Sequence, residues 1–166
     1  MRAALVLIAL VVCGPNAADA APPAEGDLYG LWKVTSYLRQ VVGTNEVTTP
    51  MGAHPNGFLE LRSDHRALYV VTAEDRKPFS KPPTPEEYRD KFITMSVFAG
   101  RYDVVGDKIT FHVEVSQFPD WVGTDIQRTL DLQGGVLHYA TTPIRMPAPN
   151  GKIEEAIFTL TLEKLK

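Results

Sequence analysis

Cysteine is nearly absent from this chain. Its 166 residues contain one cysteine, Cys13, which lies in an apolar stretch near the N-terminus. Without that stretch the chain has no thiol, and this excludes disulfide bonds, thiol catalysis and metal–thiolate centres. The domain must then be stabilised by an ordinary hydrophobic core, which a chain of this length can form.

Concentrated positive charge is also missing. The sequence has 17 Lys and Arg against 20 Asp and Glu, a formal net charge of −3, and no run of basic residues. Because proteins that bind nucleic acids usually carry a cationic patch, we expect no nucleic-acid partner.

The motifs of several enzyme classes are absent as well. No Gly-x-Ser-x-Gly, Walker or dinucleotide-binding glycine pattern occurs. His54, His65 and His138 belong to different segments and lack the spacing of a metal site. We therefore predict no metal site and no cofactor.

The N-terminus has the features of an export signal. Arg2 precedes an apolar run, residues 3–12, that is too short to cross a bilayer, and Ala18-Asp19-Ala20 has the form of a signal peptidase site. We predict that residues 1–20 are a signal peptide cleaved after Ala20. The mature protein is then periplasmic or secreted, without stable membrane insertion. Acylation of Cys13 is the alternative, although no small residue stands directly before it.

The mature chain is predicted to be a single domain. Residues 21–27 contain Pro22, Pro23 and Gly26 and are expected to form a flexible leader, and residues 28–166 form the domain. In the whole chain 44% of residues are hydrophobic and 22% are charged, which is typical of a globular protein.

Most of the domain shows the period of two that is typical of strands with one buried face. The clearest case is the stretch 108–132, in which two alternating runs flank the connection 118–123 and predict a long hairpin. Eight strands are predicted in all, at residues 32–39, 58–61, 67–72, 100–105, 109–116, 125–132, 136–142 and 154–165.

The connections between these strands predict the architecture. Tight turns at Asp64, Gly106 and Gly134 join successive strands as in a meander. Closure into a barrel removes the unpaired sheet edges, so we predict an all-β fold, an eight-stranded antiparallel up-and-down barrel. A sandwich of two sheets is the alternative. A barrel of this size has room for side chains and one small ligand.

One short helix is predicted between strands 3 and 4. Thr84 is the expected N-cap, Pro85 occupies the first helical position, and Glu87 completes a capping box with Thr84. Tyr88, Phe92 and Met95 recur at helical spacing, and we expect this stripe to pack on the body of the protein.

Several motifs of the chain resemble those of lipocalins. Gly30-Leu31-Trp32 is similar to their Gly-x-Trp signature. Over nearly all of the mature chain, further motifs resemble the bacterial and fungal lipocalin-like domain family: Gly57, Ala99-Gly100-Arg101-Tyr102, His112-Val113-Glu114-Val115-Ser116, Pro119, Trp121-Val122-Gly123-Thr124 and Gln127-Arg128. The resemblance implies a calycin-type barrel in which Trp32 closes one end beneath a basic residue of the last strand. Lys164 is the candidate for that residue. The family as a whole has no single assigned activity.

The side chains with chemical potential lie mainly on the long hairpin. His112 and Glu114 share one face of a strand, about 7 Å apart. Periodicity places this face outside, because Phe111 and Val113 are the natural core residues. The family resemblance concentrates on the His and Glu positions and favours the inside.

Arg128 has Ile126, Leu130 and Leu132 on its own face, so it is expected to point where they point. An arginine inside a barrel needs an anionic partner, which Glu114 or a ligand carboxylate would supply. A solvated position on the outer surface is the alternative for this arginine.

We expect Arg128 and Glu114 to face the interior and to form, with His112 and Trp121, the polar end of an otherwise apolar pocket. The remaining candidate ligand-binding residues are Arg76, at a proline-rich mouth loop, Tyr102 and Gln127.

Two functions follow as hypotheses. The first is an exported protein that binds a small, largely hydrophobic molecule inside the barrel, without catalysis. The second is an isomerase, cyclase or hydrolase of a hydrophobic metabolite, with His112, Glu114 and Arg128 as acid, base and oxyanion support. The enzyme requires that these three side chains converge inside the barrel.

Overall fold

The computed structural model describes residues 22–147 and 152–166. The predicted signal peptide, its cleavage site and Cys13 lie outside these residues. In the described part, ten strands form one antiparallel sheet. In chain order the helices and strands are α1 (Glu25–Leu28), β1 (Gly30–Val41), β2 (Val47–Thr48), β3 (Asn56–Leu61), β4 (Arg66–Thr72), α2 (Pro85–Ile93), β5 (Met95–Val105), β6 (Lys108–Ser116), η1 (Pro119–Trp121), β7 (Asp125–Gln133), β8 (Val136–Thr141), β9 (Ile144–Pro147) and β10 (Ile153–Lys164).

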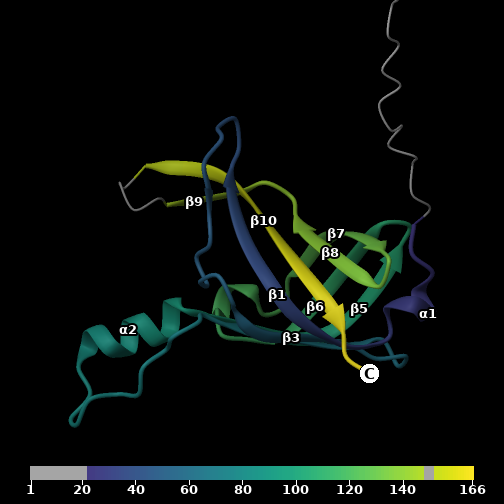
Figure 1. Cartoon of the computed structure of the whole chain (residues 1–166). Helices are drawn as coiled ribbons and strands as arrows, with labels where there is room; N and C mark the ends of the chain where they lie inside the picture. The colour runs from purple at the N-terminus through teal and green to yellow at the C-terminus, as the bar shows by residue number, and fades with distance from the viewer. Residues whose placement is uncertain (1–21, 148–151) are drawn as a thin grey trace, which may run out of the picture.

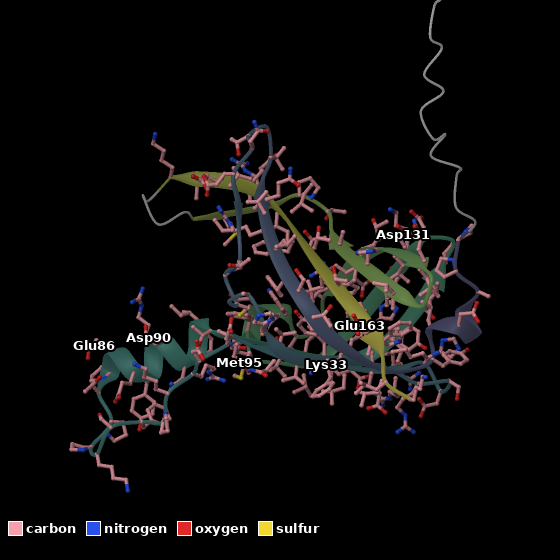
Figure 2. All side chains as sticks on the ribbon, viewed as in Figure 1. Lys33, Glu86, Asp90, Met95, Asp131 and Glu163 are labelled. Atoms are coloured by element: carbon pink, nitrogen blue, oxygen red, sulfur yellow. The ribbon has the colours of Figure 1, made fainter. Side chains whose placement is uncertain are left out.

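Eight of these strands close into a barrel (Figure 1). They follow the order β1-β3-β4-β5-β6-β7-β8-β10, and β10 pairs back with β1. Lys33 on β1 lies directly opposite Glu163 on β10, and both side chains are marked in Figure 2. The predicted all-β, eight-stranded antiparallel barrel is thereby confirmed. Closure leaves the barrel strands without unpaired edges.

The two additional strands are short and lie at one end of the barrel. β2 pairs with the end of β1, and β9 pairs with the start of β10. Because β2 adds a strand to the count, the predicted helix lies between β4 and β5, not between β3 and β4. Its place in the chain is the expected one, since it follows the predicted strand 67–72.

The two ends of the barrel differ. At one end are α1 and the C-terminus, and at the other are α2 and β9 (Figure 1). We call these the closed end and the mouth. The buried core runs from the closed end through the middle of the barrel and contains Trp32, Leu61, Tyr102, Ile109, Leu137 and Leu162. Every one of these side chains is fully buried.

A β-bulge between Val34 and Ser36 changes which side chains of β1 face inward. Before the bulge Trp32 and Val34 are buried; after it the inward positions are Tyr37 and Arg39. Simple alternation along this strand places Tyr37 and Arg39 outside with Lys33, and that assignment is wrong. An extra residue on one strand shifts the period by one and reverses the faces beyond it.

A second irregularity explains a glycine of the family motif. The register shifts between Ala99 and Gly100, where β5 and β6 approach closely. A Cβ atom at Gly100 would lie 2.0 Å from the backbone oxygen of His112, which is not a possible contact. Only glycine allows the two strands to pair here.

Helix α2 begins as predicted but packs differently. The Thr84 hydroxyl accepts from the Glu87 backbone N–H, and the Glu87 side chain accepts from the Thr84 N–H, so the capping box is present. No residue of α2 is buried, and the helix projects from the barrel (Figure 1). The expectation that its apolar stripe packs on the body holds only in part: Phe92 packs against Phe118 of the β6–β7 connection, Tyr88 packs on Phe79 of the preceding loop, and Met95 belongs to β5.

Candidate functional site

A cavity of about 360 Å³ lies inside the barrel toward the mouth. Its volume is within the range of roughly 300–1,000 Å³ that is common for small-molecule pockets. Within residues 22–147 and 152–166 the lining is mainly apolar and aromatic, and Arg128 is its one charged side chain: Tyr37, Pro50, Met51, Tyr69, Ile93, Met95, Ser96, Phe98, Phe118, Trp121, Arg128, Tyr139, Thr141, Ile144, Met146, Phe158 and Leu160.

The floor of the cavity is made of aromatic rings. Tyr69 and Phe98 stack with their centroids 4.8 Å apart, and Tyr139 lies 6.3 Å from Tyr69. Phe111 packs edge-on against Tyr139 at 6.0 Å. The four rings come from β4, β5, β8 and β6, where the period of two points them inward, and all four are buried. Tyr69, Phe98 and Tyr139 line the cavity, so its base is buried and aromatic.

The connection between β6 and β7 forms part of the mouth. Trp121 of η1 packs against Phe118 at 4.8 Å and against Phe98 at 6.3 Å. Phe92 of α2 meets Phe118 edge-on at 5.3 Å. The structure therefore places Trp121, a candidate ligand-binding residue, in the cavity wall.

Arg128 is the second candidate residue that lines the cavity. Its inward position follows from the alternation of β7, which buries Leu130 two residues further on. The guanidinium carbon lies 5.9 Å from the centre of the Tyr139 ring, and Nη1 donates a hydrogen bond of 2.8 Å to the backbone oxygen of Gln127. Nε is buried and has no hydrogen-bond partner within the described residues.

Three tyrosines surround this arginine, and all of them are neutral near pH 7. Burial raises the pKa of Tyr37 and the pKa of Tyr139 to about 12, although the nearby Arg128 charge acts in the opposite direction. Burial also raises the pKa of Tyr69 well above its usual value. The Tyr139 hydroxyl is buried and lacks a hydrogen-bond partner in the described part of the chain. The cavity thus contains one cation and neutral hydroxyls.

His112 and Glu114 lie on the outer face of the barrel. His112 is held between Asp125, 2.7 Å from Nδ1, and Asp103, 2.9 Å from Nε2. The Glu114 side chain is 46% exposed and pairs with Arg66. The expectation that Glu114 faces the interior is wrong, because the strand's inward positions are taken by the apolar residues between these polar ones.

Arg101 is a further neighbour of Glu114, 3.8 Å away on the outer face. This outer charge network also contains Asp103, His112 and Asp125. Hydrogen bonds to Asp103 and Asp125 raise the pKa of His112. The network is solvated and lies on the other side of the barrel wall from the cavity.

The other candidate residues are dispersed. Gln127 is exposed on the outside of β7. Tyr102 is fully buried near the closed end, where its hydroxyl donates to the backbone oxygen of Arg62 at 2.8 Å and burial raises its pKa to about 12. Arg76 donates to the backbone oxygen of Lys91 at 2.9 Å and so fastens the proline-rich loop to α2. None of these three lines the cavity.

The closed end is built around Trp32, which is 1% exposed. Its indole N–H donates to the backbone oxygen of Leu28 at 2.7 Å, and the Lys164 ammonium lies 5.2 Å from the ring centre. Lys164 also donates to the backbone oxygen of Asp27. Gly30 has a φ of +131°, and a Cβ there would lie 2.9 Å from the Lys164 side chain. A glycine at position 30 therefore lets the lysine reach its place over the indole.

Sequence reasoning missed several residues of the cavity, notably Tyr37, Tyr69 and Tyr139. Tyr139 lies between buried Leu137 and Thr141 in an alternating run, so its inward position was available from the pattern. Tyr37 was not, because the β1 bulge leaves no clear local signal in the sequence.

These observations define the class of protein: a closed antiparallel β-barrel with an apolar internal cavity and a tryptophan plug at the opposite end. Residues 29–165 match the family model described as lipocalin-like domain, and the chain belongs to this family. Comparison with curated proteins found no significant match.

Among solved structures, the chain is similar to the crystal structure of an uncharacterized protein from Bacteroides eggerthii DSM 20697. The two share 11% sequence identity at a TM-score of 0.40, over 83% of this chain and 99% of that one. Separately, no helix in residues 22–147 or 152–166 is long and apolar enough to span a membrane.

Proposed function

We propose that this protein is exported and binds a small, largely hydrophobic molecule in the barrel interior. The observation that carries the proposal is the cavity of about 360 Å³, which has an aromatic floor and apolar walls within a closed lipocalin-like barrel. Pockets of this kind bury most of the surface of a small ligand and orient it by a few polar groups.

The positions of the polar residues favour binding over catalysis. The enzyme hypothesis requires His112, Glu114 and Arg128 to converge, but Arg128 lies in the cavity while the other two lie outside. The buried hydroxyl groups of the cavity belong to tyrosines, whose pKa values are raised, and to Ser96 and Thr141, and neutral hydroxyls are poor general bases near pH 7. The cavity therefore has groups that orient a guest, and no histidine or carboxylate of the described part of the chain lines it.

Native mass spectrometry of protein exported by its own host tests both parts of the proposal. Export with cleavage after Ala20 predicts a mature mass that begins at Ala21, and ligand binding predicts a co-purifying adduct of small-molecule mass that organic solvent removes. A chain that still begins at Met1, or one with lipid on Cys13, contradicts the export pathway. The absence of any adduct, combined with no uptake of added apolar probes, contradicts the binding function.

A further inference from the structure

Two arginines of the barrel strands point into the barrel, and they are neutralised to different extents. Arg39 on β1 is buried, and its guanidinium pairs with Glu154 at 2.7 Å and with Glu46 at 3.3 Å. Both carboxylates belong to segments at the mouth, β10 and the β1–β2 connection. The charge of Arg39 is therefore balanced by the protein itself.

Arg128 has no such balance. Nη1 donates to the neutral backbone oxygen of Gln127 and the neighbouring Tyr139 hydroxyl is neutral, while Nε is buried without a partner and no carboxylate among residues 22–147 and 152–166 pairs with the guanidinium. Glu114, which sequence reasoning offered as its partner, is engaged by Arg66 on the other side of the wall. Among the residues that the structure describes, no acidic side chain lines the cavity.

The tyrosines next to Arg128 do not neutralise it either. Tyr37 and Tyr139 keep their protons near pH 7, because burial raises the pKa of each to about 12. Their hydroxyls can donate hydrogen bonds to a guest, and the Tyr139 hydroxyl lies next to the Arg128 side chain. A half-buried guanidinium that lines the cavity, with a buried Nε and no carboxylate partner among the described residues, favours an anionic guest.

We propose that the guest is an amphipathic monocarboxylate whose head group pairs with Arg128 beside the Tyr139 hydroxyl. This inference rests on the proposed binding function and specifies its ligand class. One guanidinium supplies one positive charge and a planar fork that fits a carboxylate in a bidentate manner. A phosphate monoester, with a charge of roughly −1.5 to −2, would remain only partly neutralised at this site.

The residues that line the cavity also indicate in which direction the apolar tail of the monocarboxylate extends. Below Arg128 the floor is closed by the Tyr69, Phe98 and Tyr139 rings. Toward the mouth the walls are Met51, Met95, Ile144, Met146 and Phe158. Met95 is marked in Figure 2, where α2 joins the barrel. The head group therefore lies on the aromatic floor and the tail extends to the mouth.

Three of the four methionines in the chain line this outer part. Methionine is unbranched and adapts to irregular partners. We expect the site to discriminate by head group and to tolerate tails of different shape.

The test uses N-phenyl-1-naphthylamine, a neutral apolar fluorophore, as reporter of the cavity. Decanoic acid and 1-decanol, which differ in the head group and hardly in the tail, compete for the site in wild type, Arg128→Met and Arg101→Met. Wild type should bind the acid roughly tenfold or more tightly than the alcohol, as expected for a charge-assisted pair. Arg128→Met should lose this preference, and Arg101→Met, which alters an arginine of the outer face, should keep it.

A measurement on wild type alone tests the same inference and does not depend on whether a variant folds. As pH falls through the carboxyl pKa of the ligand, the preference for acid over alcohol should disappear, because Arg128 stays charged while the guest becomes neutral. Equal affinity for acid and alcohol in wild type, or an unchanged preference in Arg128→Met, overturns the head-group assignment and leaves apolar binding intact. If neither the fluorophore nor either competitor binds wild type, the binding function itself is overturned, and the head-group assignment with it.

Discussion

Glu114 and Arg128 lie on neighbouring strands but on opposite sides of the barrel wall. The reason is local: residues two apart on a strand share a face, and the neighbours of each residue decide which face is dry. Glu114 is flanked by inward-facing Val113 and belongs with His112 outside, whereas Arg128 alternates in step with buried Leu130. A shift of one residue along a strand therefore decides whether a charged side chain forms a solvated ion pair, as Glu114 does, or lies in the cavity, as Arg128 does.

His112 provides a pH-dependent test of the outer network. Its folded pKa is raised, first by the hydrogen bond to Asp103 and then by that to Asp125. A raised folded pKa means that the contribution to stability is fully present below the unfolded pKa of about 6.5 and is lost as pH rises through the folded pKa. The melting temperature of wild type should therefore exceed that of His112→Gln below this window, and the difference should shrink above it.

NMR titration of His112 gives the matching direct measurement. Its pKa should lie above about 6.5 in wild type and should fall in the Asp103→Asn Asp125→Asn double variant. The stability difference should also decrease with added salt, because the side chain is 42% exposed. A wild-type pKa at or below the usual histidine value would contradict the pairing.

At the scale of elements, α2 is a helix that depends mainly on its own sequence. It buries no residue, and its apolar side chains contact a few ring partners: Tyr88 packs on Phe79 with centroids 4.9 Å apart, and Phe92 packs on Phe118. Figure 2 shows Glu86 and Asp90 on the helix away from the barrel. With little tertiary packing, its start is fixed by the capping box and the proline at the first position.

Thr84→Ala tests this independence. Loss of the N-cap hydrogen bond costs about 1 kcal/mol, which corresponds to roughly fivefold faster amide exchange in the first turn of α2. The global unfolding midpoint should stay unchanged, since the barrel does not rest on this helix. Thr84→Ser keeps the hydroxyl and should behave as wild type. A drop in the global midpoint together with unchanged exchange in α2 would show that the helix is instead coupled to the barrel.

At the scale of the whole molecule, the closed end joins parts that are far apart in the chain. At the start of the first barrel strand, Trp32 donates its indole N–H to the Leu28 carbonyl of the N-terminal segment, and the Lys164 ammonium of the last strand lies over its ring. The same two strands pair with each other to close the barrel. The plug therefore stabilises the seam on which closure depends.

Trp32→Ala should destabilise the protein by roughly 3 to 5 kcal/mol, the range for removal of a large buried aromatic side chain. The comparison is Tyr88→Ala, which removes an aromatic side chain that is 58% exposed on α2 and should cost less than about 1 kcal/mol. Urea unfolding followed by circular dichroism measures both free energies. Equal losses in the two variants would contradict the role of Trp32 as plug.

The sequence alone predicted the barrel and the capped start of α2, because each follows from periodicity or from contacts within a few residues. It favoured an inward Arg128 but left a solvated outer position open. It was insufficient where a strand departs from regular alternation. The β1 bulge turns Tyr37 and Arg39 inward, and the neighbouring residues contain no sequence signal that predicts a bulge there. The ion-pair partners of the charged residues were also decided by the tertiary structure. From the sequence, Glu114 and Arg128 could have paired with each other. In the folded barrel the wall separates them, so Glu114 pairs with Arg66 on the outside and Arg128 faces the cavity.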